Sequence, residues 1–188
     1  MADKKWDSFE QTLSIFGKEG LSRAGSEAVN ILRIPEQSKL FITTVGLPRQ
    51  PVLLCEFNLE VPNFPTLYHF ASQVRKEKED FYKFLRRIGT DGHAQICLSE
   101  DNGCGNVFAY DLNKILPIRF INSSIELFGG FLALYVGQYC KYSDRSDDEL
   151  NARACALESR MSELDPPAFD DEKNWWALVT EQMKHGLL

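Results

Sequence analysis

The chain has 188 residues, of which 44% are hydrophobic and 26% are charged, and its net charge at pH 7 is −6. This composition excludes an intrinsically disordered chain, and the length suits a single domain, residues 1–188, with a sizeable core. The acidic balance argues against a general nucleic-acid binder, because such proteins are usually basic.

The N-terminal third predicts two helices followed by a strand. Residues 6–16 carry apolar side chains at helical spacing. Residues 35–45 begin with a proline and are followed by Gly46 and Pro48, which predicts a short helix, although the run ITTV favours a strand. Residues 21–34, between the two helices, are only weakly patterned, whereas the segment 51–57, PVLLCEF, is typical of a buried strand.

The middle of the chain predicts one amphipathic helix and three strands. Residues 70–88 place Phe, Val, Leu and Ile among many Lys and Arg, which indicates a helix with a solvated basic face or, as an alternative, an ordered insertion. The same basic and aromatic run could suit nucleic acid. Asn102-Gly103 is a strong hairpin signal between two of the strands. The predicted strands are 94–99, 105–112 and 115–121.

Three helices are expected in the C-terminal part. Residues 121–142 form the clearest one, with a capping box in which Ser123 and Glu126 satisfy each other's backbone N–H groups. Gly129 and Gly130 lie inside this helix, and we expect them to let another backbone come close.

The second and third of these helices are predicted over residues 147–164 and 170–186. The third is expected to turn four apolar side chains inward: Trp175, Leu178, Val179 and Met183. Helices followed by strands and then by more helices, without βαβ alternation, predict an α+β fold with a mostly antiparallel sheet.

The five cysteines predict a reducing compartment. Their number is odd, they are scattered, and no C-x-x-C pair occurs. The polar start MADKKWDSFE is no signal peptide, and no apolar run reaches the ~20 residues that span a bilayer. We therefore expect a cytoplasmic protein without a membrane partner.

The sequence offers no assembled catalytic set. Cys104, between two glycines, could pair with His93 as an activated thiol, but an ordinary turn residue is the simpler interpretation. The histidines lack the spacing of zinc ligands, and no glycine-rich phosphate loop is present. We predict no catalytic residues, no cofactor and no metal. Thiol alkylation that leaves all measurable activity intact would dismiss the enzyme alternative.

Negative charge is concentrated in one region. Residues 144–173 hold ten acids and four bases, and the remaining residues carry equal numbers of each, so this region accounts for the whole net charge. Its two densest clusters could bind a metal or favour the starts of the following helices. Of the two adjacent tryptophans, one ring could lie near the surface, where interfaces favour Trp, although packing in the core and at its rim is the simpler interpretation. The candidate partner-binding residues are Asp147, Asp148, Glu149, Asp170, Asp171, Glu172 and Trp175.

Three blocks of the chain resemble the SUKH superfamily, in its fourth bacterial immunity branch. The first block is IPEQSKLFITTVGLP, residues 34–48. The second is FINSSIELFGGFLALY, residues 120–135. The third is an Asp…Trp…Gly pattern at Asp165, Trp176 and Gly186. The SUKH-like region thus spans residues 34–188, and residues 1–33 form an N-terminal helical extension without a clear match.

The resemblance implies a twisted sheet with flanking helices and a cytosolic protein that protects a cell from a polymorphic toxin, often a nuclease or a nucleic-acid deaminase. It assigns no catalytic residues. The implied partner is the cognate toxin domain, covered at its active site, with no direct nucleic-acid contact. The alternative is a scaffold or regulator of the same fold that has no toxin partner. Residues 1–33 and 70–88, which depart from the family pattern, could carry partner specificity.

Overall fold

The computed structural model of the chain describes residues 7–71, 82–92, 94–111, 118–140 and 147–188. Within these ranges, no helix combines the length and the apolar character needed to cross a bilayer.

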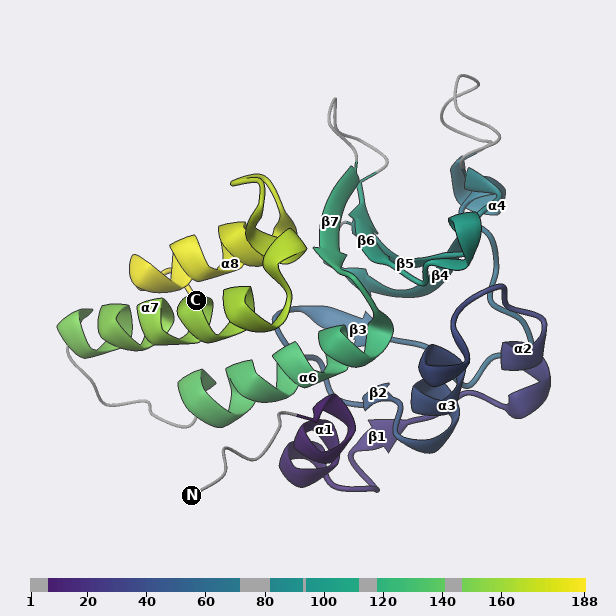
Figure 1. The fold of residues 1–188 in the computed structure, drawn as a ribbon, viewed down its shortest axis with the longest axis horizontal. Helices are drawn as coiled ribbons and strands as arrows, with labels where there is room; N and C mark the ends of the chain where they lie inside the picture. Colours follow the sequence, from purple (N-terminus) through teal and green to yellow (C-terminus); the bar gives the residue numbers. More distant parts are fainter. Residues whose placement is uncertain (1–6, 72–81, 93, 112–117, 141–146) are drawn as a thin grey trace.

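The described residues contain a five-stranded antiparallel sheet in which every strand pairs with the next one along the chain (Figure 1). A separate two-stranded ribbon joins β1 to β2. This arrangement, flanked by helices, confirms the predicted α+β class with a mostly antiparallel sheet. The strands are β1 (Leu21–Ser22), β2 (Leu47–Pro48), β3 (Cys55–Phe57), β4 (Leu85–Asp91), β5 (Ala94–Ser99), β6 (Val107–Tyr110) and β7 (Ile118–Asn122).

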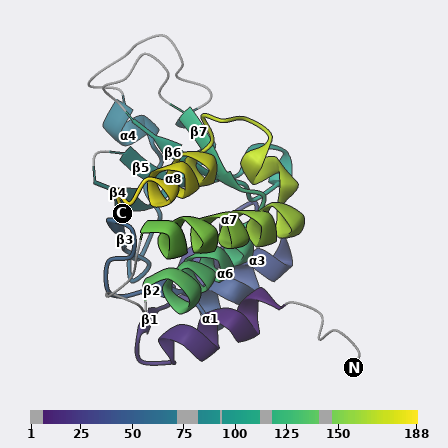
Figure 2. The same ribbon diagram turned by 90° about the vertical axis from the view of Figure 1, so that its left-hand side faces the viewer.

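The helices come mainly before and after the sheet in the sequence. Figure 2 shows α8, α7, α6 and α1 stacked one above the other, so the first helix and the last three form one continuous layer. The helical elements are α1 (Ser8–Phe16), α2 (Ser26–Asn30), α3 (Glu36–Thr44), α4 (Tyr68–Ala71), η1 (Asp101–Gly103), α6 (Ile125–Tyr135), η2 (Val136–Cys140), α7 (Asp147–Leu164), η3 (Pro166–Phe169) and α8 (Trp175–Lys184).

The main core lies between the sheet and the helices α6 and α8. Phe128 of α6 contacts Phe57 of β3 on one side and Trp175 of α8 on the other, with ring centroids 5.6 and 6.2 Å apart. Along β5, Ile96 faces this core, whereas its neighbour Cys97 joins a smaller cluster because successive strand residues point to opposite faces. The sheet is therefore covered by apolar side chains on both faces.

The predicted helices of the N-terminal third are confirmed. The carboxylate of Asp7 caps α1 by accepting a hydrogen bond from the Phe9 N–H at 2.8 Å. Helix α3 ends at Thr44, and Gly46 follows with a φ of 85°, a conformation that favours glycine. The start and stop signals thus outweighed the β-branched run.

Residues 70–88 do not form one amphipathic helix. Their last part belongs to β4, and positions 72–81 lie outside the described residues. The pattern was misleading because the pairing of β4 with β5 shifts between Arg87 and Gly89, which interrupts the alternation of a strand. Arg86 is not on a solvated helix face either, since its Nε donates to the Glu100 carboxylate at 2.6 Å.

The predicted strand 51–57 is folded back on itself. Only Cys55–Phe57 joins the sheet, and a two-residue turn at Leu53 and Leu54 precedes it. In contrast, β5 has the predicted bounds, and the hairpin at Asn102-Gly103 connects it to β6. The last helix begins at Trp175, five residues later than predicted.

The predicted capping box of α6 is wrong by one residue. Ser124 is the N-cap, and its hydroxyl accepts a hydrogen bond from the Leu127 N–H at 3.3 Å. Ser123 instead donates its hydroxyl to Asp165, and Glu126 accepts a hydrogen bond from the Ser38 hydroxyl. Both side chains of the expected box therefore hold distant segments in place.

Gly129 permits a close approach to α6, although the neighbour is a side chain and not a backbone as predicted. A Cβ at this position would lie 2.5 Å from Cζ of the Phe41 ring, which is fully buried.

We expect Gly129→Ala to lower the free energy of unfolding by about 1–3 kcal/mol, because a fully buried ring has little room to move away. Urea denaturation followed by tryptophan fluorescence measures the loss. Adding Phe41→Leu should recover part of it. An unchanged denaturation midpoint for Gly129→Ala would show that the packing adapts freely at this contact.

Candidate protein-interaction surface

A buried polar network joins the last strand of the sheet to the C-terminal helices. The Asp165 carboxylate accepts hydrogen bonds from Asn122 Nδ2 and the Ser123 N–H, both at 2.9 Å, and from the Ser123 hydroxyl at 2.6 Å. The indole Nε1 of Trp176 donates to Asn122 Oδ1 at 2.9 Å. Asn122, Asp165 and Trp176 are each at most 2% exposed. The network therefore fixes β7, η3 and α8 relative to one another.

This network brings together the second and third blocks of the SUKH resemblance. Asn122 and Ser123 come from the second block, and Asp165 and Trp176 from the third. The first block is tied to the second by the Ser38–Glu126 hydrogen bond of 2.9 Å. The motif residues in these contacts thus stabilise the interior.

Both tryptophans of the adjacent pair are buried, which agrees with packing in the core and not with a ring near the surface. Trp175 is 2% exposed and Trp176 is 0% exposed. The rings pack edge to face with centroids 4.7 Å apart, and Trp175 Nε1 donates to Asp91 Oδ2 at 2.6 Å. Trp175 nevertheless lines a small surface cleft together with Leu54 and Leu178.

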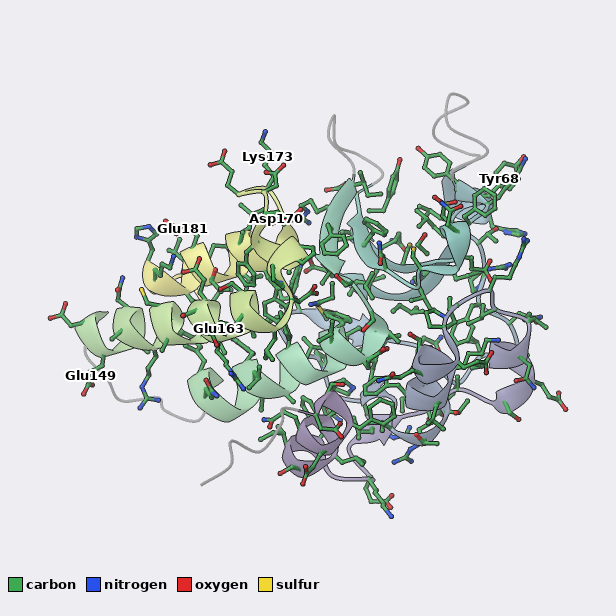
Figure 3. The ribbon with its side chains drawn as sticks, in the orientation of Figure 1. Tyr68, Glu149, Glu163, Asp170, Lys173 and Glu181 are labelled. Atoms are coloured by element: carbon green, nitrogen blue, oxygen red, sulfur yellow. The ribbon has the colours of Figure 1, made fainter. Side chains whose placement is uncertain are left out.

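The two acidic clusters lie at opposite ends of α7. Asp147 begins the helix and is followed by the exposed Asp148 and Glu149, whereas the second cluster comes after η3. The 18 residues of α7 span about 27 Å. Figure 3 shows Glu149 and Asp170 well separated along the helical layer. The clusters therefore form two patches, not one.

The second cluster is exposed and lies outside the helix that it precedes. Asp170, Asp171 and Glu172 are solvent-facing, and the first turn of α8 contains no acid. One Asp171 oxygen accepts the Lys173 N–H at 2.9 Å, which shapes the connection. These carboxylates are thus separated from the first turn of α8 that they were expected to favour, whereas Asp148 and Glu149 do lie in the first turn of α7.

A groove of about 620 Å³ runs along the outer side of α8 and is lined by Glu158, Glu172 and Glu181. Hydrogen bonds from His185 and Lys184 lower the pKa of Glu181, so this carboxylate stays ionised. Lys173 also lines the groove. Figure 3 shows Glu181, Asp170 and Lys173 along this side of the molecule.

Leu178 also lines the groove, and it is 37% exposed. The prediction that it packs inward is therefore wrong. Successive helix residues are separated by 100°, which places Leu178 about 130° from the mean direction of the buried α8 side chains. A helical wheel of α8 would have revealed this exposure, because it places Leu178 away from the side of the helix that carries the buried residues.

The thiols and imidazoles do not assemble a reactive pair among the described residues. Burial raises the pKa of Cys97 to about 12, and burial together with the Asp91 charge raises that of Cys55 well above its usual range. Cys104 is partly exposed, and His93, its suggested base, lies outside the described residues. In the parts of the chain that the structure covers, no three His, Cys, Asp or Glu side chains cluster as metal ligands would.

Comparison with known proteins supports the resemblance. A family model described as SUKH-4 immunity protein matches residues 9–182. The match begins within α1 and includes most of α8, so residues 9–33, which were expected to lie in an extension without a clear match, belong to the matched region. No curated protein and no solved structure shows significant similarity.

Proposed function

The chain belongs to the SUKH-4 immunity protein family, and from that premise we propose that it binds one cognate toxin domain and neutralises it by covering the toxin's active site. The observation that carries this proposal is the exposed carboxylate surface of the α7–α8 region, on a fold whose motif residues are engaged internally. The protein would act in the cytoplasm through this contact, without catalysis or a cofactor.

The charge of this surface suggests the class of toxin. A nuclease or nucleic-acid deaminase has to attract phosphate, so its active-site face is commonly basic. Carboxylates on the immunity protein would offer the same sign of charge as the nucleic acid. Such complementarity mainly raises the association rate and selects the partner.

Co-expression with the toxin domain encoded beside this chain's gene tests the proposal. We expect the chain to restore growth and to co-purify with the toxin domain. A chain that does neither is no immunity protein for that toxin, and the scaffold or regulator alternative would then gain support.

Charge reversal separates the contributions of the two acidic clusters. We expect the triple variant with Lys at 170, 171 and 172 to slow toxin association about tenfold at low salt and to flatten its salt dependence. The variant with Lys at 147, 148 and 149 should slow association less, because α7 places this cluster about 27 Å from the second cluster, whose Glu172 lines the groove. That distance exceeds the ~8–10 Å over which charges interact strongly near physiological salt. Stopped-flow association at several salt concentrations measures both rates.

A matched control is the triple replacement of Glu19, Glu27 and Asp101 by Lys, which changes the net charge equally at exposed sites elsewhere. An equal slowing by all three variants would show that net charge alone, and not the α7–α8 surface, governs association.

A further inference from the structure

The turn before β3 has an unusual backbone. Val52 and Cys55 exchange two backbone hydrogen bonds, of 2.8 and 3.2 Å, around the two residues between them. Those residues, Leu53 and Leu54, have φ angles of 52° and 63°. A two-residue hairpin turn with positive φ at both positions follows the type I′ pattern, which strongly favours Asn-Gly.

Leucine is a poor choice for this turn. Left-handed backbone is unfavourable for a residue with a Cβ, and such strain tends to be retained at functional sites. Leu53 packs partly against the core, which gives it a structural role. Leu54 does not: its side chain is 73% exposed. The fold therefore holds a large apolar side chain in solvent on a backbone that would relax with glycine.

Leu54 lines a cleft that shares Leu178 with the acidic groove. The cleft, of about 200 Å³, is lined by Leu53, Leu54, Trp175 and Leu178 among its apolar residues and by the polar side chains Asp91 and Arg119. Leu178 also lines the groove of the three glutamates, so it lies between the two cavities on the exposed side of α8. Apolar and acidic surface are thus continuous here.

We propose that this surface, the cleft at Leu54 and Leu178 with the adjoining acidic groove, is where the toxin domain docks. This inference rests on the proposed function and adds the contact face and the partner's chemistry: an apolar side chain seated against the leucines, flanked by Lys or Arg that face the groove. Interfaces commonly have this form, with an apolar centre inside a polar rim.

Charge argues against a second copy of the chain as the occupant. A two-fold contact presses one patch against the same patch. Lys184 already pairs with Glu158 and Glu181 within the chain, at 2.6 and 3.4 Å, which leaves Lys173 as the one lysine that lines the groove, so a copy offers too few cations for Glu172 and its acidic neighbours. In such a contact the carboxylates of one copy would face either the carboxylates or the leucines of the other copy, and both arrangements are unfavourable.

Truncation of Leu54 should weaken toxin binding without weakening the fold. We expect Leu54→Gly to raise the Kd for the neighbouring toxin domain about tenfold without lowering the melting temperature, because glycine accepts the turn's backbone. Leu178→Ala, which keeps the helix, should weaken binding similarly. The control is Leu40→Ala on α3, a 54% exposed leucine that lines neither cavity, and it should bind normally.

Calorimetric titration with the toxin domain measures the Kd of each variant, and thermal melts measure its melting temperature. Normal binding by Leu54→Gly and Leu178→Ala, with wild-type affinity intact, would overturn this docking site alone. A wild-type chain that fails to bind would overturn the proposed function. A melting temperature that falls with Leu54→Gly would assign Leu54 a structural role and remove the argument from strain.

Discussion

Asp165→Ala is expected to lower the free energy of unfolding by about 3–5 kcal/mol, a large share of the 5–15 kcal/mol typical of a native domain. The replacement removes both acceptor oxygens of a carboxylate that is 2% exposed. The Asn122 amide, the Ser123 N–H and the Ser123 hydroxyl would each lose a partner. Buried donors without acceptors carry their full desolvation cost.

Urea denaturation of purified protein measures this loss, and Asp170→Ala provides the matched control. Asp170 is an exposed acid in the same connection, so its removal should change stability by no more than about 0.5 kcal/mol. A loss below 1 kcal/mol for Asp165→Ala would mean that water replaces the carboxylate, and the network would no longer explain how β7 and the C-terminal helices are fixed together.

This network shows where reading a sequence reaches its limit. The Ser123-x-x-Glu126 spacing is a valid local signal, yet the partners of Ser123 and Glu126 are Asp165 and Ser38, far away in the chain. A local pattern cannot reveal a competing long-range acceptor. The cap therefore moved to Ser124, although the existence of the helix was predicted correctly.

The sheet was predicted best where turn chemistry and alternation agree. Strand β5 was found with its correct ends because it precedes the Asn102-Gly103 hairpin. Strand β4 was missed because a bulge and two charged residues imitate a helix period. The charge of Arg86 is met by Glu100, which is distant in the sequence, so nothing nearby indicates that a strand can hold it.

The candidate site was predicted only in part. Composition alone located the negative charge in residues 144–173, but helix length separates its two clusters. The turn at Leu53 and Leu54 carries no Gly, Asn or Asp, so the segment was interpreted as one strand. A turn formed by residues with low turn propensity is recognised only once the backbone is known.

Arg86→Met is expected to lower the free energy of unfolding by about 3 kcal/mol, since it leaves a buried carboxylate without its cation. The Glu100 side chain is 2% exposed and that of Arg86 is 23% exposed, with 2.6 Å between Nε and Oε2. Glu100 keeps one hydrogen bond, from the Arg33 N–H at 3.0 Å, which places the expected loss at the lower end of the range for broken buried pairs.

Arg160→Met is the control, because the Arg160–Glu163 pair has side chains that are 45% and 64% exposed and should contribute at most about 1 kcal/mol. The double variant Arg86→Met, Glu100→Gln removes both charges and still lets the glutamine oxygen accept the Arg33 N–H. It should therefore recover more than half of the loss in urea denaturation. A double variant no more stable than Arg86→Met would trace the loss to the other contacts of the Arg86 side chain, such as the one from Nη1 to the Phe64 carbonyl at 3.4 Å, and not to its charge.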